Sequence, residues 1–496
     1  MPSAVTFLAI DHGSDSGRCF AGHFSGERLT LEEVARWPNG PVRIGSSLYW
    51  NAFGLWQASS DALAQAGQRW GERVRSVGVS TWGVDFALLA EDDTLLDAPH
   101  HYRDPRVEGL IEEACRVVSR EMIYAQTGVQ FVQVNTLFQL LALARRNAPC
   151  LLHAARLLMM PDLFHFWLSG VQATERSIAS TTQCYNPGTG CWADEILGLL
   201  NLPHHIFGEI VEPGTNLGPL RSTIAETTGL TRTAVIAPVS HDTQSAVAAI
   251  PAGAGPWAFL SSGTWSRMGV ERTEPLITPA SLAADMTNEV GYGNTITLLT
   301  NIIGLWLLQE SRRCWQRAGR SLTFAEIEQL AAHTPACASL IDPGDPSFLN
   351  PPDMLAAIRR YCERTGQVAP VQVGEIARCI YESLALTYRR VAQRLDILTG
   401  HRLETVHLVG GGAQSALLCQ LAADAMERPV IAGPVEATAL GSVLVQAMSL
   451  GYIASHAEAR ELVRRSFPPT VYQPRSSARW QEAEARFARM PPVASG

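Results

Sequence analysis

The stretch AIDHGSDSGR, from Ala9 to Arg18, joins an apolar segment to a tight polar turn. Residues 5–10 are apolar apart from one threonine and predict a buried strand that ends at Asp11. The small residues that follow let the backbone approach an anion, hydroxyl and N–H groups can donate hydrogen bonds to it, and an arginine balances its charge. The pattern predicts a strand that ends in a phosphate-binding turn made of Ser14, Ser16, Gly17 and Arg18.

Asp15 departs from this pattern, because it places a carboxylate inside a turn suited to a phosphate. Two like unit charges 4 Å apart repel by roughly 4 kcal/mol at the effective dielectric constant near a protein surface. The turn can still bind phosphate if Arg18 or a Mg²⁺ ion intervenes, or if the side chain turns away and only its N–H is used. We therefore expect Asp15 to affect either the affinity for the phosphate or the dependence on metal.

Strand and helix patterns on both sides of this turn predict an α/β fold. The strand patterns cover residues 19–24 with 28–37 as a hairpin, 74–80, 85–89 with 94–97 as a second hairpin, and 234–239. Helical periodicity covers residues 52–70, 107–120, 137–146, 150–168 and 242–249, and later 302–313, 324–332, 374–398 and 415–426.

A Gly- and Pro-rich segment, Pro251–Pro256, is the candidate domain boundary of this 496-residue chain. Beyond it an apolar run, Trp257–Leu260, again leads into a small polar turn, Ser261–Thr264. This recurrence predicts two related lobes. We expect domains over residues 1–250 and 257–450, followed by a packed tail over 451–496 without a chemical role.

Charge and hydropathy narrow the range of partners. The chain has a net charge of −8 and no basic run, which argues against nucleic acid or an acidic membrane surface. The N-terminus lacks the pattern of a secretory signal, and arginines and a proline interrupt the apolar runs, so no membrane-spanning helix is expected. These features predict a soluble, cytoplasmic protein.

The chain contains no lysine, since all 39 residues counted as Lys plus Arg are arginine. This excludes a Walker-A loop, the ATP-binding lysine of protein kinases, a pyridoxal Schiff base and a lysine general base. The ten cysteines show no metal-binding spacing and are expected to be reduced thiols. Cys184 with Cys191, or Cys362 with Cys379, could nevertheless lie close together.

Asp242 lies between a strand pattern and a helix pattern in VSHDTQSA, residues 239–246. A carboxylate at this place lies outside the end of a sheet strand, where α/β proteins bind ligands. Two interpretations stay open. Asp242 is either the N-cap of the helix or a general base that takes a proton from a substrate hydroxyl.

Three further motifs place glycines or polar groups beside predicted strand ends. STWGVDFALL holds Gly83 and Asp85, which need special backbone geometry and polar surroundings. TNIIGLWLLQE predicts a helix in which Asn301 and Gln309 lie about two turns apart on one face. LVGGGAQSALLCQL, residues 408–421, predicts a glycine turn that lets a ligand contact backbone at a helix N-terminus.

In combination these motifs resemble those of the FGGY carbohydrate kinase family. The resemblance runs from about Val5 to about Gln446 and is carried by AIDHGSDSGR, STWGVDFALL, HYRD, TGVQFVQVNTLFQLLAL, LLMMPD, SHDTQSA, FLSSGTWSRMG, TNIIGLWLLQ, HLVGGGAQS and AGPVEATALG. It implies two actin-like (ribonuclease-H-like) lobes, with ATP and a sugar bound in an active-site cleft between them. It also implies phosphoryl transfer from ATP to a ketose, with L-rhamnulose favoured over another ketose such as L-fuculose. A catalytically weakened actin-fold protein that binds sugar or nucleotide is the alternative from a different class.

The resemblance further implies roles for individual residues. Asp242 would be the catalytic base, and the ketose would contact Gly83, His241, Asp242, Thr243 and Asn301. The nucleotide would contact Ser14, Asp15, Ser16, Gly17, Arg18, Thr264, Gln309 and Gly411. Mg²⁺ would lie near Asp11, and the protein would be a monomer or a homodimer.

Overall fold

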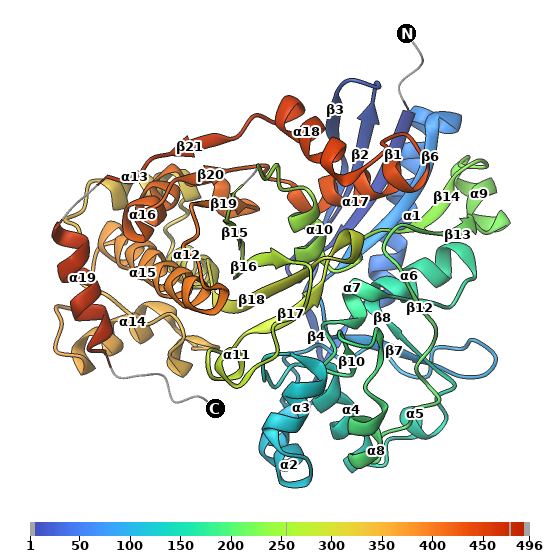
Figure 1. Cartoon of the computed structure of the whole chain (residues 1–496), viewed down its shortest axis with the longest axis horizontal. Coiled ribbons are helices and arrows are strands. Elements are labelled where there is room, and N and C mark those ends of the chain that lie inside the picture. Colours follow the sequence, from blue (N-terminus) through green and yellow to red (C-terminus); the bar gives the residue numbers. More distant parts are fainter. Residues whose placement is uncertain (1–4, 254, 476–477, 491–496) are drawn as a thin grey trace. The chain divides into compact units, whose positions relative to one another are not determined.

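The computed structural model describes residues 5–253, 255–475 and 478–490, which form two compact units (Figure 1). Unit 1 takes the residues up to Pro251, Glu271–Leu298 and Ala437–Ser466. Unit 2 takes Ala252–Val270, Leu299–Glu436 and the residues from Phe467 onward. The units follow packing rather than the order of the chain, so the sequence division into 1–250, 257–450 and 451–496 stays a proposal.

A six-stranded sheet with the order β13-β14-β6-β1-β2-β3 forms the centre of unit 1. Strands β1, β2 and β3 are antiparallel neighbours at one side of the sheet. On the other side of β1, strands β6 and β14 run parallel to it. This is the strand order of the expected ribonuclease-H-like lobe, and it confirms the first predicted hairpin. The bounds are β1 Val5–His12, β2 Ser16–Phe24, β3 Leu29–Pro38, β6 Val74–Thr81, β13 Thr215–Pro219 and β14 Ala234–Ala237.

Helices cover both faces of this sheet (Figure 1). Val77 and Val79 of β6 belong to the core that includes residues of α1 (Ala52–Trp70) and α6 (Met160–Ser169). Because side chains alternate along a strand, Ser76 and Gly78 face the other way, where both meet Gln446 of α17 (Ala437–Ser449). The α17 helix also packs against α10 (Asp242–Ala248).

Residues between β6 and β14 add a smaller region with its own hydrophobic core. Here β7 (Phe86–Leu89) pairs with β8 (Arg156–Met159). The second predicted hairpin is present only at its closed end, as an antiparallel bridge between Leu89 and Leu95 flanked by hydrogen bonds from Ala90 N–H to the Thr94 carbonyl and from Leu96 N–H to the Leu88 carbonyl. The prediction of one helix over 150–168 is wrong, because β8 separates a short helix, α5 (Pro149–Leu152), from α6. An apolar run buried on both sides does not distinguish strand from helix by its periodicity.

The other elements of unit 1 are short or peripheral. The helices are α2 Leu110–Val117, α3 Arg120–Thr127, α4 Thr136–Arg145, α5 Pro149–Leu152, α7 Arg176–Ala179, α8 Asp194–Leu199, α9 Ser222–Thr228, α11 Pro279–Ala283 and α18 His456–Ser466. The strands are β4 Pro41–Ile44, β5 Ser47–Trp50, β9 Thr174–Glu175, β10 Tyr185–Asn186, β11 Cys191–Trp192, β12 Ile210–Val211 and β17 Thr287–Val290. The helical pattern over 107–120 is interrupted at Val118–Ser119, where α2 gives way to α3.

The second sheet repeats the strand order of the first. Its order is β17-β18-β16-β15-β19-β20-β21, with β15 antiparallel to β16 and parallel to β19. Its strands are β15 Trp257–Ser262, β16 Trp265–Arg272, β18 Ile296–Ile303, β19 Thr405–Val409, β20 Val430–Ala432 and β21 Thr470–Tyr472. The recurrence predicted from the two strand–turn segments is therefore confirmed.

Unit 2 contains six helices among the described residues: α12 Trp306–Arg317, α13 Phe324–Ala332, α14 Met354–Arg364, α15 Val373–Thr399, α16 Ala416–Met426 and α19 Ala478–Ala488. The predicted helix over 302–313 begins only at Trp306, and Asn301 lies in β18 instead. Gly304 forms the intervening turn, and a Cβ there would lie 2.5 Å from Ser266 Oγ. Asn301 and Gln309 thus do not share a helix face, and that prediction is wrong.

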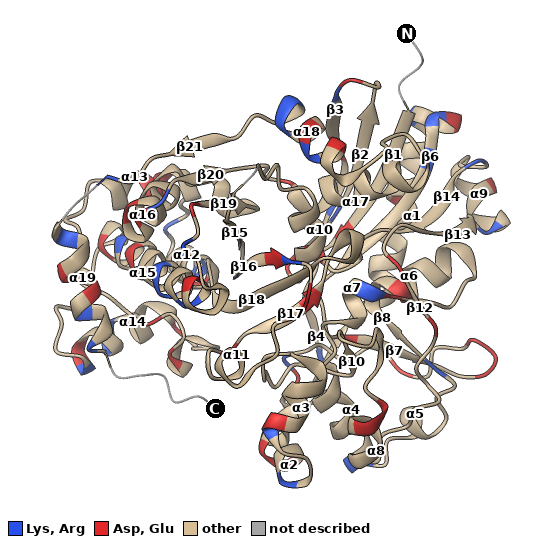
Figure 2. Cartoon of the chain, viewed as in Figure 1, with Lys and Arg blue, Asp and Glu red and all other residues tan. Residues whose placement is uncertain are grey.

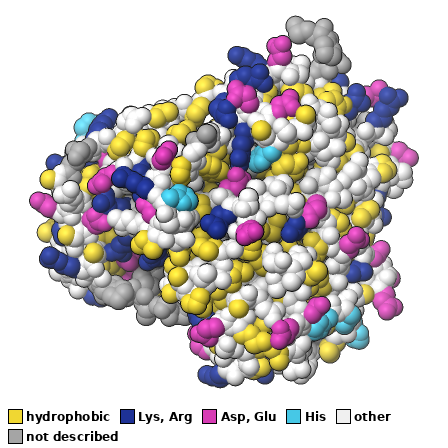
Figure 3. Space-filling model, viewed as in Figure 1, with side chains coloured by type: hydrophobic (Ala, Val, Ile, Leu, Met, Phe, Trp, Pro, Cys, Tyr) yellow, Lys and Arg dark blue, Asp and Glu magenta, His cyan; other side chains and the backbone are white. Residues whose placement is uncertain are grey.

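Arg and acidic side chains are interspersed over the elements (Figure 2), and hydrophobic and charged groups are mixed on the face shown in Figure 3. Within the described residues, no helix is long and apolar enough to cross a membrane. All ten cysteines are free thiols.

Candidate active site

The phosphate-binding turn predicted from Ser14, Ser16, Gly17 and Arg18 connects β1 to β2. Gly13 N–H donates to the carbonyl of Ser16 at 3.0 Å, and Arg18 pairs with Asp11 across the two strands at 3.5 Å between Nη2 and Oδ2. A Cβ on Gly17 would lie 2.0 Å from Nε1 of Trp37, so only glycine fits beneath this ring. The turn is short, and its last residues pack closely against the neighbouring strands.

Asp15 is exposed at the tip of the turn. Its carbonyl accepts a hydrogen bond from Asn39 N–H at 3.1 Å, and Asn39 Nδ2 donates to the carbonyl of Gly13 at 2.8 Å. Asn39 therefore holds the backbone of the turn, while the Asp15 carboxylate is on the solvent side.

Gly83 lies just after β6 in a strained segment. A Cβ on Gly83 would lie 3.1 Å from three atoms of Thr181. Its neighbour Val84 has φ of 69°, a conformation that is unusual for a β-branched residue. Thr181 Oγ1 accepts from Val84 N–H at 3.1 Å, and Thr136 Oγ1 donates to the Val84 carbonyl at 2.6 Å. Such strain concentrates at functional sites.

Asp85 is fully buried beneath Gly83 and organises the residues around it. Its carboxylate accepts hydrogen bonds from the indoles of Trp50 and Trp82 at 2.6 and 2.9 Å, from Tyr102 N–H at 3.2 Å and from Gln139 Nε2 at 2.7 Å. Burial raises the pKa of Asp85 to about 6, although the hydrogen bonds from these donors act to lower it. Asp85 has a structural explanation and needs no contact with a ligand.

Three parallel strands bring these segments to one edge of the sheet. The ends of β1 and β6 pair through Asp11 with Ser80 and His12 with Thr81. Thr81 in turn bridges to His241 beyond β14, and its N–H donates to the carbonyl of Ser240 at 2.9 Å. Carboxyl ends of parallel strands are where α/β proteins bind ligands.

Asp242 is the first residue of α10, and His241 occupies the N-cap position. Asp242 Oδ1 accepts from the N–H and the hydroxyl of Thr243, at 2.5 and 3.0 Å. An N-cap side chain would instead accept from the second or third residue of the helix, so the capping interpretation does not describe this geometry. The Asp242 side chain retains 24% exposure, whereas that of His241 retains 1%.

His241 lies between two carboxylates. Its Nε2 is 3.3 Å from Asp242 Oδ1, and its Nδ1 is 3.0 Å from Oε2 of Glu289 on β17. Both are ion-pair distances, although neither contact has the angles of a hydrogen bond. Sequence reasoning missed Glu289, because nothing in TNEVGYG indicates that a residue 48 positions further along the chain returns to His241.

The backbone of the Ser240–His241 turn rests on a second buried acid, Glu175. Its Oε2 accepts from Ser240 N–H at 3.0 Å and from the hydroxyl of Ser177 at 2.5 Å. The Ser177 hydroxyl oxygen in turn accepts from His241 N–H at 3.2 Å. Burial raises the pKa of Glu175 to about 7, although these hydrogen bonds favour the carboxylate. Sequence reasoning missed this residue too.

The remaining predicted residues lie in unit 2. The β15–β16 turn carries Thr264, whose carbonyl accepts from the N–H groups of Gly304 and Trp306, both at 3.2 Å. Asn301 Oδ1 accepts from Arg267 Nε at 3.0 Å. Gln309 lies in the first turn of α12, and its Oε1 is buried without a hydrogen-bond partner.

Gly411 lies in the glycine turn after β19. A Cβ on Gly411 would meet nothing within 4 Å, whereas one on Gly412 would lie 2.3 Å from Ser262 Oγ. The turn thus packs against the end of β15 through Gly412 and leaves Gly411 accessible. The backbone of Gly411 is therefore accessible at the place where the sequence predicts contact with a ligand.

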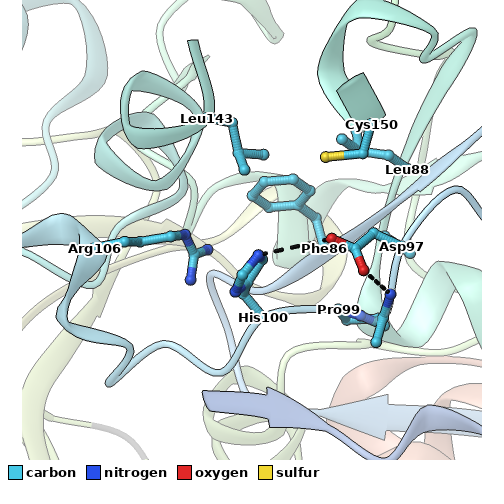
Figure 4. A pocket seen from close by; sticks show the side chains of 10 residues that line it. Phe86, Leu88, Asp97, Pro99, His100, Arg106, Leu143 and Cys150 are labelled. Atoms are coloured by element: carbon cyan, nitrogen blue, oxygen red, sulfur yellow. Dashed lines mark hydrogen bonds and ion pairs between the residues drawn. The ribbon is translucent and has the colours of Figure 1, made fainter. Parts of the chain in front are cut away.

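A cavity elsewhere in unit 1 does not belong to this site (Figure 4). It has a volume of about 20 Å³, and Figure 4 shows His100 between Arg106 and Asp97 in its wall. Burial lowers the pKa of His100 to about 4, so the ring is neutral at pH 7. The cavity has room for about one water molecule and not for a sugar or a nucleotide.

Comparison with known families agrees with the two-lobed topology. The model of the N-terminal domain of the FGGY family of carbohydrate kinases matches residues 7–249, and that of the C-terminal domain matches residues 258–450. The chain belongs to the FGGY family of carbohydrate kinases. As an FGGY kinase it is an enzyme that phosphorylates carbohydrate, which confirms the expected reaction class.

Full-length relatives of this FGGY kinase are named rhamnulokinases. That of Bacteroides thetaiotaomicron is 43% identical over 481 residues, covering 97% of this chain and 98% of the relative. That of Pectobacterium carotovorum is 40% identical over 482 residues, covering 97% and 95%. That of Enterococcus faecalis is 38% identical over 471 residues, covering 94% of both chains.

Solved structures of other FGGY-type sugar kinases share the fold. The ligand-bound xylulose kinase from Lactobacillus acidophilus has a TM-score of 0.80 at 16% identity, with 98% of this chain and 97% of that chain covered. Glycerol kinase of Plasmodium falciparum with ADP has a TM-score of 0.78 at 14% identity, with the same coverage. At such identities the likeness shows the fold alone, and it confirms the expected α/β architecture of two actin-like lobes.

Proposed function

We propose that this kinase transfers the terminal phosphate of ATP to L-rhamnulose, giving L-rhamnulose 1-phosphate in L-rhamnose catabolism. The substrate is supported by the rhamnulokinases that are 38–43% identical over nearly the whole chain. The observation that carries the mechanism is the partly exposed Asp242 carboxylate, held by Thr243 at the carboxyl edge of the unit 1 sheet.

In this mechanism Asp242 accepts the proton of the sugar hydroxyl as its oxygen attacks the terminal phosphorus. Phosphoryl transfer depends mainly on positioning and on stabilising charge, with a base for the proton. Gly83, His241, Thr243 and Asn301 are proposed to contact the ketose. Gly83 is buried directly after β6, where Thr181 leaves little room for a side chain beside the backbone.

ATP is the phosphoryl donor of carbohydrate kinases, and we propose two sets of residues that bind it. The β1–β2 turn would bind the phosphates through backbone N–H groups, hydroxyls and a guanidinium, using Ser14, Asp15, Ser16, Gly17 and Arg18. In unit 2, Thr264, Gln309 and Gly411 would contact the nucleotide. The buried, unpartnered Oε1 of Gln309 supports this assignment, because a buried amide oxygen without a donor is costly.

Mg²⁺ is implied by the family, and Asp11 fits a supporting role. Among the described residues no group of three or more His, Cys, Asp or Glu side chains could hold a metal ion. Mg²⁺ in kinases is commonly held by one or two carboxylates together with substrate phosphates, and when bound it neutralises charge on those phosphates. Asp11 is a buried carboxylate beside the turn, and we propose it as the residue that holds the ion. A cytoplasmic location and a monomeric or dimeric state stay predictions.

A ketose panel tests the substrate. Formation of ADP in a coupled assay is measured with L-rhamnulose, L-fuculose, D-xylulose and D-fructose at equal concentrations. We expect L-rhamnulose to give the highest kcat/KM, and mass spectrometry to find the product phosphorylated at O1. Higher kcat/KM for another ketose would contradict the substrate, and ATP hydrolysis without any sugar phosphate would contradict the kinase.

Asp242→Asn tests the base. The amide has the same shape but cannot accept the proton, so kcat should fall by about 10²–10⁴-fold while sugar affinity changes little. Asp194→Asn is the matched control, because Asp194 is the first residue of another short helix, α8, and its side chain is 72% exposed. A nearly normal kcat for Asp242→Asn would mean that its charge serves only the helix N-terminus.

A further inference from the structure

His241 is held in one orientation by residues of two elements. The ring is 99% buried, at the start of α10, with one nitrogen facing Asp242 and the other facing Glu289 of β17. An imidazole between two carboxylates has one favourable orientation, because turning the ring over would place its carbon atoms Cδ2 and Cε1 where the two nitrogens lie. Each ring nitrogen thus faces one carboxylate, and the balance between these two acids determines which nitrogen carries the proton.

Glu289 is itself fixed in place. Gln244 Nε2 donates to Glu289 Oε2 at 2.8 Å and lies 2.7 Å from Thr297 Oγ1. Gln244 is three residues after His241, on the same face of α10, so one carboxylate oxygen meets both side chains. The Glu289 side chain is only 7% exposed. Burying a carboxylate costs free energy unless polar or charged partners stabilise it. The partners of Glu289 include His241 and Gln244, which belong to the segment that carries Asp242.

We propose that Glu289 is a positioning residue for the catalytic base. It attracts the ring proton of His241 to Nδ1, which leaves Nε2 to face Asp242. The lone pair of that Nε2, 3.3 Å from Asp242 Oδ1, then favours the neutral acid that Asp242 becomes when it takes the proton from the sugar hydroxyl. The proton leaves the sugar oxygen as this oxygen bonds to phosphorus and the bond from phosphorus to ADP breaks, so the atoms and charges balance. This role rests on the proposed function, because it acts only through Asp242.

A double-mutant cycle separates positioning from structural support. We expect Glu289→Gln to lower kcat by about 10- to 100-fold, a part of the roughly 10²–10⁴-fold that a general base contributes, with little change in the sugar and ATP dissociation constants. In an Asp242→Asn background the same change should cost less than about twofold, because the base through which Glu289 acts is gone. The slow variants are followed by mass spectrometry of the sugar phosphate.

Two further variants keep the cycle informative. Glu382→Gln removes another buried carboxylate, which accepts from Cys337 N–H and pairs with Arg378 in unit 2, and should leave kcat unchanged. If Glu289→Gln does not fold, Glu289→Asp draws the carboxylate back by one methylene and should show the same dependence on Asp242. Equal losses of kcat with and without Asp242 would overturn the proposal, as would a loss confined to the dissociation constants.

The result of the double-mutant cycle does not depend on which ketose is the substrate. The cycle is run with whichever ketose the panel finds to be phosphorylated, so the replacement of L-rhamnulose by another ketose overturns only the proposed substrate. A chain that phosphorylates no ketose overturns both proposals.

Discussion

Asp15 introduces a carboxylate into a turn whose other side chains are hydroxyls and a guanidinium. In the structure the residue is exposed, and Asn39 holds its backbone. Water around the side chain weakens its repulsion of a phosphate, from roughly 4 kcal/mol at a surface-like dielectric constant toward about 1 kcal/mol in bulk water. The cost of Asp15 should therefore be modest and should depend on the ions present.

Asp15→Ser should tighten ATP binding by about fivefold or more at low magnesium and low salt, and by less at saturating magnesium. The dissociation constant of a non-hydrolysable ATP analogue is measured at several magnesium concentrations. Asp61→Ser, which changes an exposed acid on α1, is the control. Weaker binding with a higher magnesium requirement would mean that Asp15 helps to hold the metal, and identical titrations would mean that its side chain does not matter.

At the scale of elements, the position of α10 decides where Asp242 lies. On one side α10 packs against α17, where Gly441 is in contact with the backbone of Ser245. The turn before α10 rests on Glu175, next to α7. Two predictions follow from these contacts, one on packing and one on pH.

Gly441→Ala should destabilise the protein by about 1–3 kcal/mol and also lower kcat, because the helices must separate. The added Cβ would lie 1.8 Å from the carbonyl oxygen of Ser245, a backbone atom that cannot rotate away. Urea unfolding measures the loss. Gly253→Ala is the control, because its Cβ would meet no atom within 4 Å. Equal stability of the two variants would show that α17 adjusts without cost.

Glu175 should make the protein less stable as the pH rises toward neutrality. Burial raises its pKa from 4.5 to about 7, so the folded state favours the protonated form. The stabilisation is fully present below pH 4.5 and is lost as the pH rises through 7, by up to about 3 kcal/mol. Urea unfolding between pH 4.5 and 7.5 should therefore show a smaller decrease for Glu175→Gln than for the wild type. Parallel pH curves would mean that its hydrogen bonds keep Glu175 ionised throughout.

At the scale of the whole molecule, unit 1 is completed by segments that come late in the chain. The α17 helix covers one face of β1 and β6, and β17 brings Glu289 to His241. A chain that ends at residue 250 lacks both segments, although it contains residues 7–249, which match the N-terminal family domain.

Residues 1–250 expressed alone should therefore not reach an ordered state. Without α17 the face of β6 that carries Ser76 and Gly78 loses its cover, so we expect binding of a hydrophobic dye, weak near-ultraviolet circular dichroism and no cooperative unfolding. Co-expression with residues 251–496 should restore order. Cooperative unfolding of the isolated fragment would instead show that the first sheet is stable without α17.

Features that depend on neighbouring residues can be predicted from the amino-acid sequence alone. The turn from Asp11 to Arg18, the β2–β3 hairpin, α1 and the start of α10 at Asp242 follow from local periodicity, small residues and the order of strand and helix patterns. The motifs, read as a family resemblance, indicated the candidate site residues.

Features that depend on partners far apart in the chain become visible only in the folded protein. Residues 156–159 form a strand because β7 pairs with them, and Asn301 lies in β18 because the chain turns at Gly304 against Ser266. His241 meets Glu289 only because α10 and β17 pack together, and periodicity cannot show which buried side chains will meet. Burial and hydrogen bonding across the fold, rather than local preference, determine these contacts.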